Sequence, residues 1–371
     1  MPYSGGTDLR TLPMEDRERC PSWYGLKRRL RFKYRYLFLL CVILLFYSIW
    51  KNKSLLRQHS WWLTDETHYA KAPHNQVHPK HQVKLDENNP SNMGNAGGTQ
   101  YHLAYPRNYH FLMDVGDVCE SRAPFLVLMV PVEPKNVAAR DAIRSTWGKE
   151  KVVQGKKVLT LFVLGLAEGP NLQRESELHG DLIQSDFRDT YRNLTIKTMV
   201  IMDWLATRCP TADYAMKIDS DMFLNIDNLV LMLQKPDIPQ TDYLTGHLMR
   251  NSPVIRSKSS KWYVSEETFP DRVYPLYTSG TGYVFSNDLP RKLVEISKRI
   301  KPFDMEDAYV GMCMKELGLA IPSPPDPSQF RAYYNKFERC MYSKIITSVV
   351  KSPTQLIDFW GQLKMAPGPP C

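Results

Sequence analysis

Short apolar runs and helix-like segments alternate through the middle of the chain. Phe125-Leu-Val-Leu-Met-Val130 is apolar at every position, which is typical of a strand buried on both faces of a sheet. Similar strand patterns occupy residues 158–163, 182–183 and the start of 214–224, and helical patterns occupy 136–147, 172–179 and 194–208. This is the spacing of successive βαβ units, so the sequence predicts a Rossmann-like α/β fold with a mostly parallel sheet and helices on both faces.

The pattern changes after Lys235. Residues 241–285 combine aromatic side chains with glycines and predict a loop-rich segment, whereas residues 289–298 predict a further helix. Three acids, Asp304, Glu306 and Asp307, precede an apolar helical run, and the N-terminus of a helix favours carboxylates. The proline-rich segment 322–329 predicts neither a helix nor an inner strand.

An uncharged run from Tyr36 to Trp50 stands apart from these patterns. As a helix it would span roughly 22 Å, enough for a thin bilayer if the flanking Lys and Arg side chains reach the interface. Six Lys and Arg residues precede the run within residues 27–35, and this excess predicts a cytosolic N-terminus. A cleaved signal peptide is the alternative, but no small-x-small cleavage site follows. The sequence therefore predicts an uncleaved transmembrane signal anchor.

Charge and cysteine content refine the domain organisation. Residues 1–118 hold 16 Lys/Arg against 10 Asp/Glu, while residues 119–371 hold 32 against 29, so the folded part is not predicted to bind nucleic acid. We predict a cytosolic tail at 1–35, the anchor at 36–50, a luminal stem at 51–118 and a luminal folded domain at 119–371. The chain contains no Cys-x-x-Cys pair, so its cysteines do not predict a zinc module. In an oxidising lumen five cysteines become disulfide candidates, an odd number that leaves one free or paired between chains: Cys119, Cys209, Cys313, Cys340 and Cys371.

The candidate chemistry begins at Asp219-Ser220-Asp221. These acids follow an apolar run that starts at Tyr214, and ligands of open parallel sheets bind beyond the carboxyl ends of the strands. Carboxylate oxygens at that edge suit a divalent cation and, with it, a phosphate. One Asp-x-Asp pair is no more than chance predicts in this composition, so the assignment depends on other features of the chain.

Six stretches of the predicted domain share one order with a known family. They are Arg140–Gly148, Asp186–Thr198, Lys217–Asp221, Ser260–Tyr263, Ser279–Val284 and Glu306–Gly311. Together they resemble the Golgi β-1,3-glycosyltransferases, most closely the β-1,3-galactosyltransferases, over about residues 119–371. The resemblance implies a glycosyltransferase A-type fold in a single-pass type II Golgi membrane protein.

The resemblance also implies a reaction and its main residues. Galactose would move from UDP-galactose to a glycoprotein or glycolipid glycan in β-1,3 linkage, with inversion. Asp221, with Asp219, would hold Mn²⁺ or another divalent cation on the donor diphosphate. Asp307 would be the general base that takes the proton of the acceptor hydroxyl as that hydroxyl attacks. Glu306 would lie beside it as an orienting or sugar-contacting acid.

Further residues are candidates for supporting roles. The two arginines of Arg140–Gly148 follow the first strand, at the sheet edge where a nucleotide should bind. The glycines of Ser279–Val284 would form a turn that lets the backbone approach a ligand closely. The tryptophan of Ser-Lys-Trp-Tyr favours galactose over N-acetylglucosamine. The candidates are Arg140, Arg144 and Ser220 for donor contact, and Trp262, Gly280 and Gly282 for sugar or acceptor contact. Asn193-Leu-Thr195 is an N-glycosylation sequon.

Departures from the family pattern keep two alternatives open. Family members usually carry a histidine in the stretch that here reads Ile345–Val350, and no histidine follows His247. Ala308 replaces a larger apolar residue, and Thr278 stands where relatives often have cysteine. The alternatives are a β-1,3-N-acetylglucosaminyltransferase and a catalytically weak family member that binds glycans.

Overall fold

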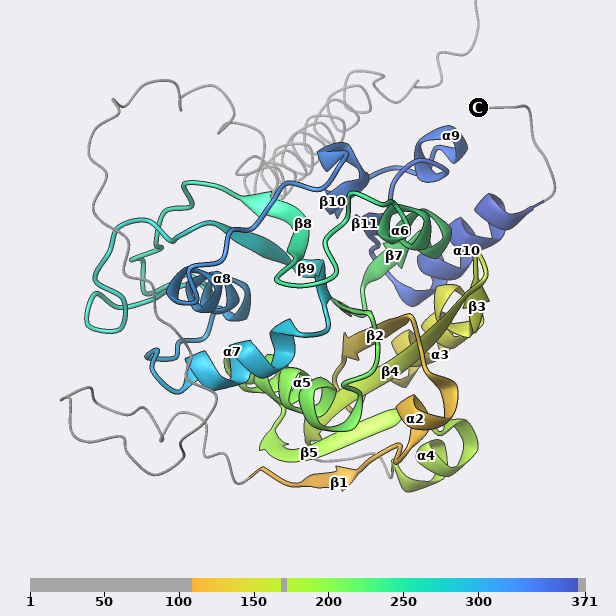
Figure 1. Ribbon diagram of the computed structural model, residues 1–371, viewed down its shortest axis with the longest axis horizontal. Coiled ribbons are helices and arrows are strands. Elements are labelled where there is room, and N and C mark those ends of the chain that lie inside the picture. Colours follow the sequence, from red (N-terminus) through yellow and green to blue (C-terminus); the bar gives the residue numbers. More distant parts are fainter. Residues whose placement is uncertain (1–108, 168–171, 366–371) are drawn as a thin grey trace, which may run out of the picture. The chain divides into compact units, whose positions relative to one another are not determined.

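The computed structural model describes residues 109–167 and 172–365 (Figure 1). The predicted tail, the anchor at 36–50 and most of the predicted stem lie outside these residues. Within the described ranges, no helix combines the length and apolar character needed to cross a membrane.

Four parallel strands form the centre of the larger sheet. Their spatial order is β5 (Leu182–Arg188), β4 (Lys156–Leu166), β2 (Leu126–Pro131) and β6 (Tyr214–Ile218). Antiparallel strands flank them, with β1 (Phe111–Met113) next to β5, and β9 (Tyr277–Ser286) and β8 (Leu244–Met249) beyond β6; β3 (Val152–Val153) pairs with β4. The predicted mostly parallel sheet is confirmed. Because β2 lies between β4 and β6, the winding reverses there, and a ligand crevice is expected beyond the carboxyl ends of β2 and β6.

Helices cover both faces of this sheet, as predicted. Successive side chains of a strand point to opposite faces, so Val127 and Met129 join one core, and Leu126 and Leu128 join the other. The first core is covered by α5 (Leu194–Arg208), α7 (Leu289–Ser297) and α8 (Glu306–Glu316). The second is covered by α3 (Val137–Ser145), α6 (Ile226–Leu233) and α10 (Pro353–Lys364) (Figure 1). Burial on both faces explains the unbroken apolar runs.

A smaller sheet joins the C-terminal segment to the middle of the chain. Its strands are β10 (Phe330–Tyr334), β11 (Thr347–Val349) and β7 (Met222–Leu224), with β11 parallel to β10 and antiparallel to β7. The short helices are α2 (Val118–Arg122), α4 (Gln173–His179), α9 (Arg339–Tyr342), η2 (Trp147–Lys149), η3 (Tyr191–Asn193) and η4 (Pro327–Gln329). Because β7 starts directly after Asp221, this sheet supports the predicted metal pair.

Several predicted boundaries were wrong. The segment 241–285 contains β8 and most of β9, whose glycines and polar residues hid the strand pattern. The strand predicted at 182–183 continues to Arg188. The prediction ended too early because Gln184 and Ser185 are polar, although both are buried in the sheet. The pairing of β1 with β5 places residues before 119 in the folded domain. One 3₁₀ turn, η4, forms within the proline-rich segment.

The disulfide candidates divide as their odd number predicts. Cys119 and Cys209 form a disulfide that joins α2 to the end of α5, and Cys340 is disulfide-bonded as well. Cys313, buried in α8, is free. A link across 90 residues typically contributes about 2–4 kcal/mol to stability.

Candidate active site

Asp219-Ser220-Asp221 forms the tight connection between β6 and β7. The Asp219 N–H donates to the Thr281 carbonyl of β9 at 3.1 Å, and the Val350 N–H donates to the Asp221 carbonyl at 2.8 Å. Ser220 is half-buried between the two acids, and Asp221 is exposed. Both sheets therefore hold the pair at the carboxyl edge that the sequence predicted.

Lys217 connects this acid pair to the second group of acids. Its Nζ donates to Asp219 Oδ1 at 2.7 Å, to Glu306 Oε1 at 2.8 Å and to the Gly280 carbonyl. Burial opposes its charge, but the two carboxylates more than offset that effect and raise the pKa of Lys217. Lys217 was not among the predicted site residues, although a lysine inside an apolar strand and just before two acids is a recognisable signal.

Glu306 lies in the first turn of α8 and uses both carboxylate oxygens within the protein. Oε1 accepts from Lys217, while Oε2 accepts from the Thr198 hydroxyl at 3.1 Å and from the Tyr283 hydroxyl at 3.2 Å. The residue is 6% exposed. These contacts suit the orienting role predicted for Glu306 better than a direct sugar contact.

Asp307 follows in the same helical turn and keeps a partly exposed carboxylate. The Gly280 N–H donates to Oδ2 at 3.0 Å, and the Ala308 N–H donates to Oδ1 at 2.8 Å. Burial raises the pKa of Asp307, which these two donors only partly offset. A fixed carboxylate with a raised pKa is a better proton acceptor than an ordinary aspartate, as a general base requires.

The glycines predicted to form a turn instead lie within strand β9, so that prediction was wrong. A Cβ added at Gly280 would lie 2.7 Å from Glu306 Oε1 and 3.4 Å from Asp307 Oδ2. At Gly282 it would lie 3.1 Å from the Met216 side chain. In the structure, Gly280 therefore makes room for the protein's own acids.

Gly280→Ala is expected to move both α8 acids away from their partners. Overpacking of this kind typically costs about 1–3 kcal/mol, and the transfer rate should fall because Asp307 is displaced as well. Urea unfolding and transfer assays would measure both effects. Gly361→Ala is the matched control, since no atom lies within 4 Å of its new Cβ. A Gly280→Ala protein with wild-type stability and activity would contradict this account of the glycine.

The side chains of the Arg140–Gly148 motif make structural contacts within the protein. Arg140 is completely buried, and its Nε and Nη2 each donate to Glu175 at 2.6 Å. Arg144 shares Glu175 at 2.8 Å. The Trp147 indole donates to the Met222 carbonyl at 3.1 Å, directly after Asp221. These contacts give the predicted donor roles of Arg140 and Arg144 no support, because both guanidinium groups are engaged in ion pairs.

A second buried lysine lies near the expected crevice. Lys197 Nζ donates to Asp189 Oδ2 at 2.7 Å and to the Val132 carbonyl, just beyond β2, at 2.9 Å. Burial lowers the pKa of Lys197, and Asp189 only partly offsets this. The Lys197–Asp189 pair fixes the start of α5 against the carboxyl end of β2. Two residues of the Asp186–Thr198 motif therefore have a structural role.

Asn193 is half-buried, and its side-chain amide donates to the Arg188 carbonyl at 2.8 Å. The sequon hydroxyl of Thr195 is also buried and donates to the Phe303 carbonyl at 2.7 Å. Glycosylation of Asn193 stays a prediction, and it would have to precede folding of this segment.

Trp262 lies on the loop 250–276 and packs against the Lys261 ammonium. Lys261 Nζ lies 4.6 Å from the centre of the Trp262 ring and 5.7 Å from that of Tyr191. Burial and then the nearby Asp307 charge raise the pKa of Tyr191. Tyr191 and Lys261 are thus site residues that the sequence analysis did not identify.

Asp221 has the properties of a cation ligand. Although Asp221 reaches solvent, desolvation by the surrounding protein and then the Asp219 charge raise its pKa, while Lys217 and Lys261 oppose the rise. A bound cation would relieve the repulsion between the two carboxylates. Across the described part of the chain no group of three or more His, Cys, Asp and Glu side chains gathers as a metal site.

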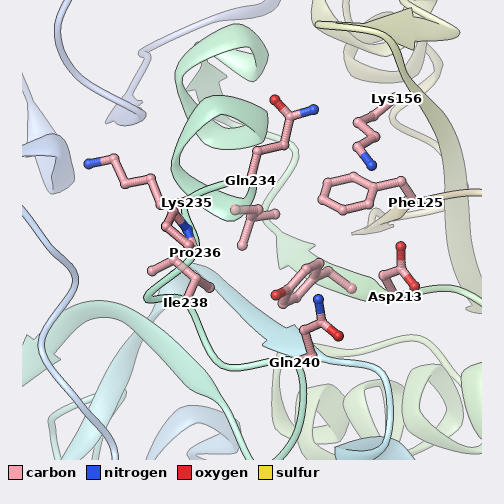
Figure 2. Close-up of a pocket in the computed structure, with 10 residues that line it drawn as sticks. Phe125, Lys156, Asp213, Gln234, Lys235, Pro236, Ile238 and Gln240 are labelled. Atoms are coloured by element: carbon pink, nitrogen blue, oxygen red, sulfur yellow. The ribbon is translucent and has the colours of Figure 1, made fainter.

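A depression of about 410 Å³ lies elsewhere, near the amino ends of β2 and β6 (Figure 2). Phe125, Asp213 and Tyr214 line it, and Lys156 Nζ lies 4.8 Å from the centre of the Phe125 ring. Because Asp219 follows the opposite end of β6, this depression is separate from the acids.

Comparison with known proteins identifies the class. The family model described as Galactosyltransferase matches residues 138–325, so the chain is a glycosyltransferase by family. It is 42% identical to beta-1,3-galactosyltransferase 2 of Pongo abelii, over 72% of this chain and 67% of that protein. It is 39% identical to beta-1,3-galactosyltransferase 5 of Homo sapiens, over 72% of this chain and 88% of that protein. The chain belongs to the galactosyltransferase family.

Among solved structures, the chain is similar to a glycosyltransferase involved in glycosylation of the major capsid of PBCV-1. The match has 11% identity and a TM-score of 0.36, and it covers 64% of this chain and all of that one. At this score the similarity carries no conclusion. Family membership itself implies a sugar donor and a glycan acceptor.

Proposed function

We propose that this protein is a type II Golgi β-1,3-galactosyltransferase that transfers galactose from UDP-galactose to a glycan acceptor with inversion. The observation that carries the proposal is the fixed, partly exposed Asp307 beside an acid pair at the carboxyl edge of β6. The beta-1,3-galactosyltransferases among the relatives support the donor and the linkage. The predicted anchor at 36–50 and the Cys119–Cys209 disulfide support a luminal location.

Asp307 supplies the base in this proposal. One carboxylate oxygen accepts the proton of the acceptor hydroxyl while the acceptor oxygen bonds to the anomeric carbon, and the bond from that carbon to the diphosphate breaks. UDP leaves with the electron pair. The N–H groups of Gly280 and Ala308 keep the carboxylate oriented throughout. A single displacement inverts the α-linked donor to a β product.

Asp221 and the remaining oxygen of Asp219 would hold Mn²⁺ or another divalent cation. When bound, the cation would neutralise the charge that develops on the leaving diphosphate. Because Asp219 Oδ1 already accepts a hydrogen bond from Lys217, Asp221 would contribute the larger share of the protein's ligation of the cation.

Asp221→Asn is expected to weaken Mn²⁺ binding at least tenfold, because the amide supplies no negative charge. In the wild type, the raised pKa of Asp221 means that cation affinity falls with decreasing pH, starting above the ordinary value of 3.8. Electron paramagnetic resonance of free Mn²⁺ would measure both effects without an activity assay. The exposed Asp237→Asn is the control. Unchanged Mn²⁺ affinity in Asp221→Asn would refute the assignment.

The decisive experiment is a panel of sugar nucleotides tested on the purified luminal fragment with Mn²⁺. Transfer from UDP-galactose alone would support the proposal, whereas transfer from UDP-N-acetylglucosamine would favour the related enzyme. Absence of transfer and of hydrolysis with every donor would contradict both enzymes and favour the glycan-binding alternative.

A further inference from the structure

The loop 250–276 between β8 and β9 is braced by one side chain. Arg256 Nη1 donates to the Val264 carbonyl at 2.8 Å, and its Nη2 donates to the carbonyls of Phe269 at 2.6 Å and Asp271 at 2.8 Å. The loop is drawn in teal in Figure 1. Three backbone acceptors on one guanidinium give this long connection a fixed shape.

Lys261 lies at a turn of this braced loop. The Ser260 N–H donates to the Ser257 carbonyl at 3.0 Å, and the Tyr263 N–H donates to the Ser260 carbonyl at 3.2 Å. The Lys261 ammonium then lies against the rings of Trp262 and Tyr191. Contact with ring faces holds a cation and leaves its N–H groups able to donate elsewhere.

The ring of Tyr191 fixes where this ammonium lies. Tyr191 belongs to η3, directly before α5. The first two turns of α5 bond to Phe303, in the segment that leads into α8, through Thr195, and to Glu306, the first residue of α8, through Thr198. Lys261 is therefore close to the acids.

The two lysines of the site differ in what they can bind. The buried Lys217 already donates to Asp219, Glu306 and the Gly280 carbonyl, which uses its three N–H groups. Lys261 is exposed and, within residues 109–167 and 172–365, forms no ion pair. A polyanionic ligand that approaches this acidic site needs cations, and Lys261 is the lysine with free donors.

We infer that Lys261 binds the diphosphate of the donor nucleotide, an inference that rests on the proposed function. The aromatic pair Tyr191 and Trp262 positions the ammonium, and the Arg256 brace positions the loop. Lys261 thereby adds to the charge of the cation at Asp221.

The test compares UDP with uridine, which lacks the phosphates, by ligand-observed NMR titration of the luminal fragment. The titrations are run at saturating Mg²⁺ and again in EDTA. Lys261→Met is expected to weaken UDP binding about tenfold in both conditions, the loss of one charge-assisted contact, and to leave uridine binding unchanged. Lys261→Arg should keep most of the UDP affinity. Lys258→Met, three residues earlier on the same loop, should bind both ligands as the wild type does.

Wild-type UDP affinity in Lys261→Met would overturn this inference and leave the proposed function intact. Equal losses for UDP and uridine would also overturn it, because they would show that the lysine only supports the loop. If the wild type binds neither ligand, both the proposal of a uridine nucleotide donor and this inference would be overturned.

Discussion

Asp307→Asn is expected to lower kcat for sugar transfer by about 10³-fold. General-base catalysis typically contributes about 10²–10⁴-fold, and the amide cannot take the proton of the acceptor hydroxyl. Asn also turns one acceptor into an NH₂ group that faces the N–H of Gly280 or Ala308, so stability should fall by about 1 kcal/mol. Transfer assays at saturating donor and acceptor would measure the main effect.

Two comparisons separate loss of the base from general damage. UDP binding should be unchanged in Asp307→Asn, and Asp304→Asn, an exposed acid three residues earlier, should transfer normally. In the wild type the active form has Asp307 ionised, so kcat should fall as the pH drops through its raised pKa, above the ordinary 3.8. Transfer by Asp307→Asn at the wild-type rate would exclude this residue as the base.

Lys217→Met is expected to lower the free energy of unfolding by about 3–5 kcal/mol. The lysine side chain is 4% exposed and that of Glu306 is 7% exposed, so the variant leaves a buried carboxylate without its cation. In the wild type the raised pKa of Lys217 means that its contribution is complete below about pH 10.5 and is lost as the pH rises through the folded-state pKa. Urea unfolding at neutral pH would measure the difference.

A double variant tests the cause of this loss. Lys217→Met with Glu306→Gln removes the unpaired charge, so it should be more stable than Lys217→Met alone. Lowering the pH should also reduce the deficit of the single variant, because Glu306 then takes up a proton. If the two substitutions are simply additive, the lysine and the glutamate do not act as a pair.

The sequence predicted the centre of the fold because its strands are buried on both faces. The runs around Val127 and Leu161 therefore read as unbroken apolar segments. Strands β8 and β9 lie toward the edge, where Gly246, Gly280 and Gly282 interrupt the apolar pattern. Local periodicity does not reveal that such glycines make room for a neighbouring carboxylate.

Local sequence patterns likewise do not reveal the tertiary contacts of the candidate active site. Asp219, Asp221 and Asp307 were identifiable only through the family resemblance, because one Asp-x-Asp pair is no more than chance predicts and a helix N-terminus favours carboxylates for structural reasons. The ion-pair partner of Arg140 lies in α4, and two of the three partners of Lys217 lie in α8 and β9, so only the tertiary structure assigns these residues their roles.

The pairing of β7 with β11 sets a lower limit for any working fragment of this enzyme. Residues 138–325, which the family model matches, contain both acid pairs but end before β11 and the Val350 N–H that holds Asp221. A fragment trimmed to that core would keep every proposed catalytic side chain and lose one of the anchors of the proposed metal-binding turn. The smallest functional unit therefore extends well beyond the region by which the family is recognised.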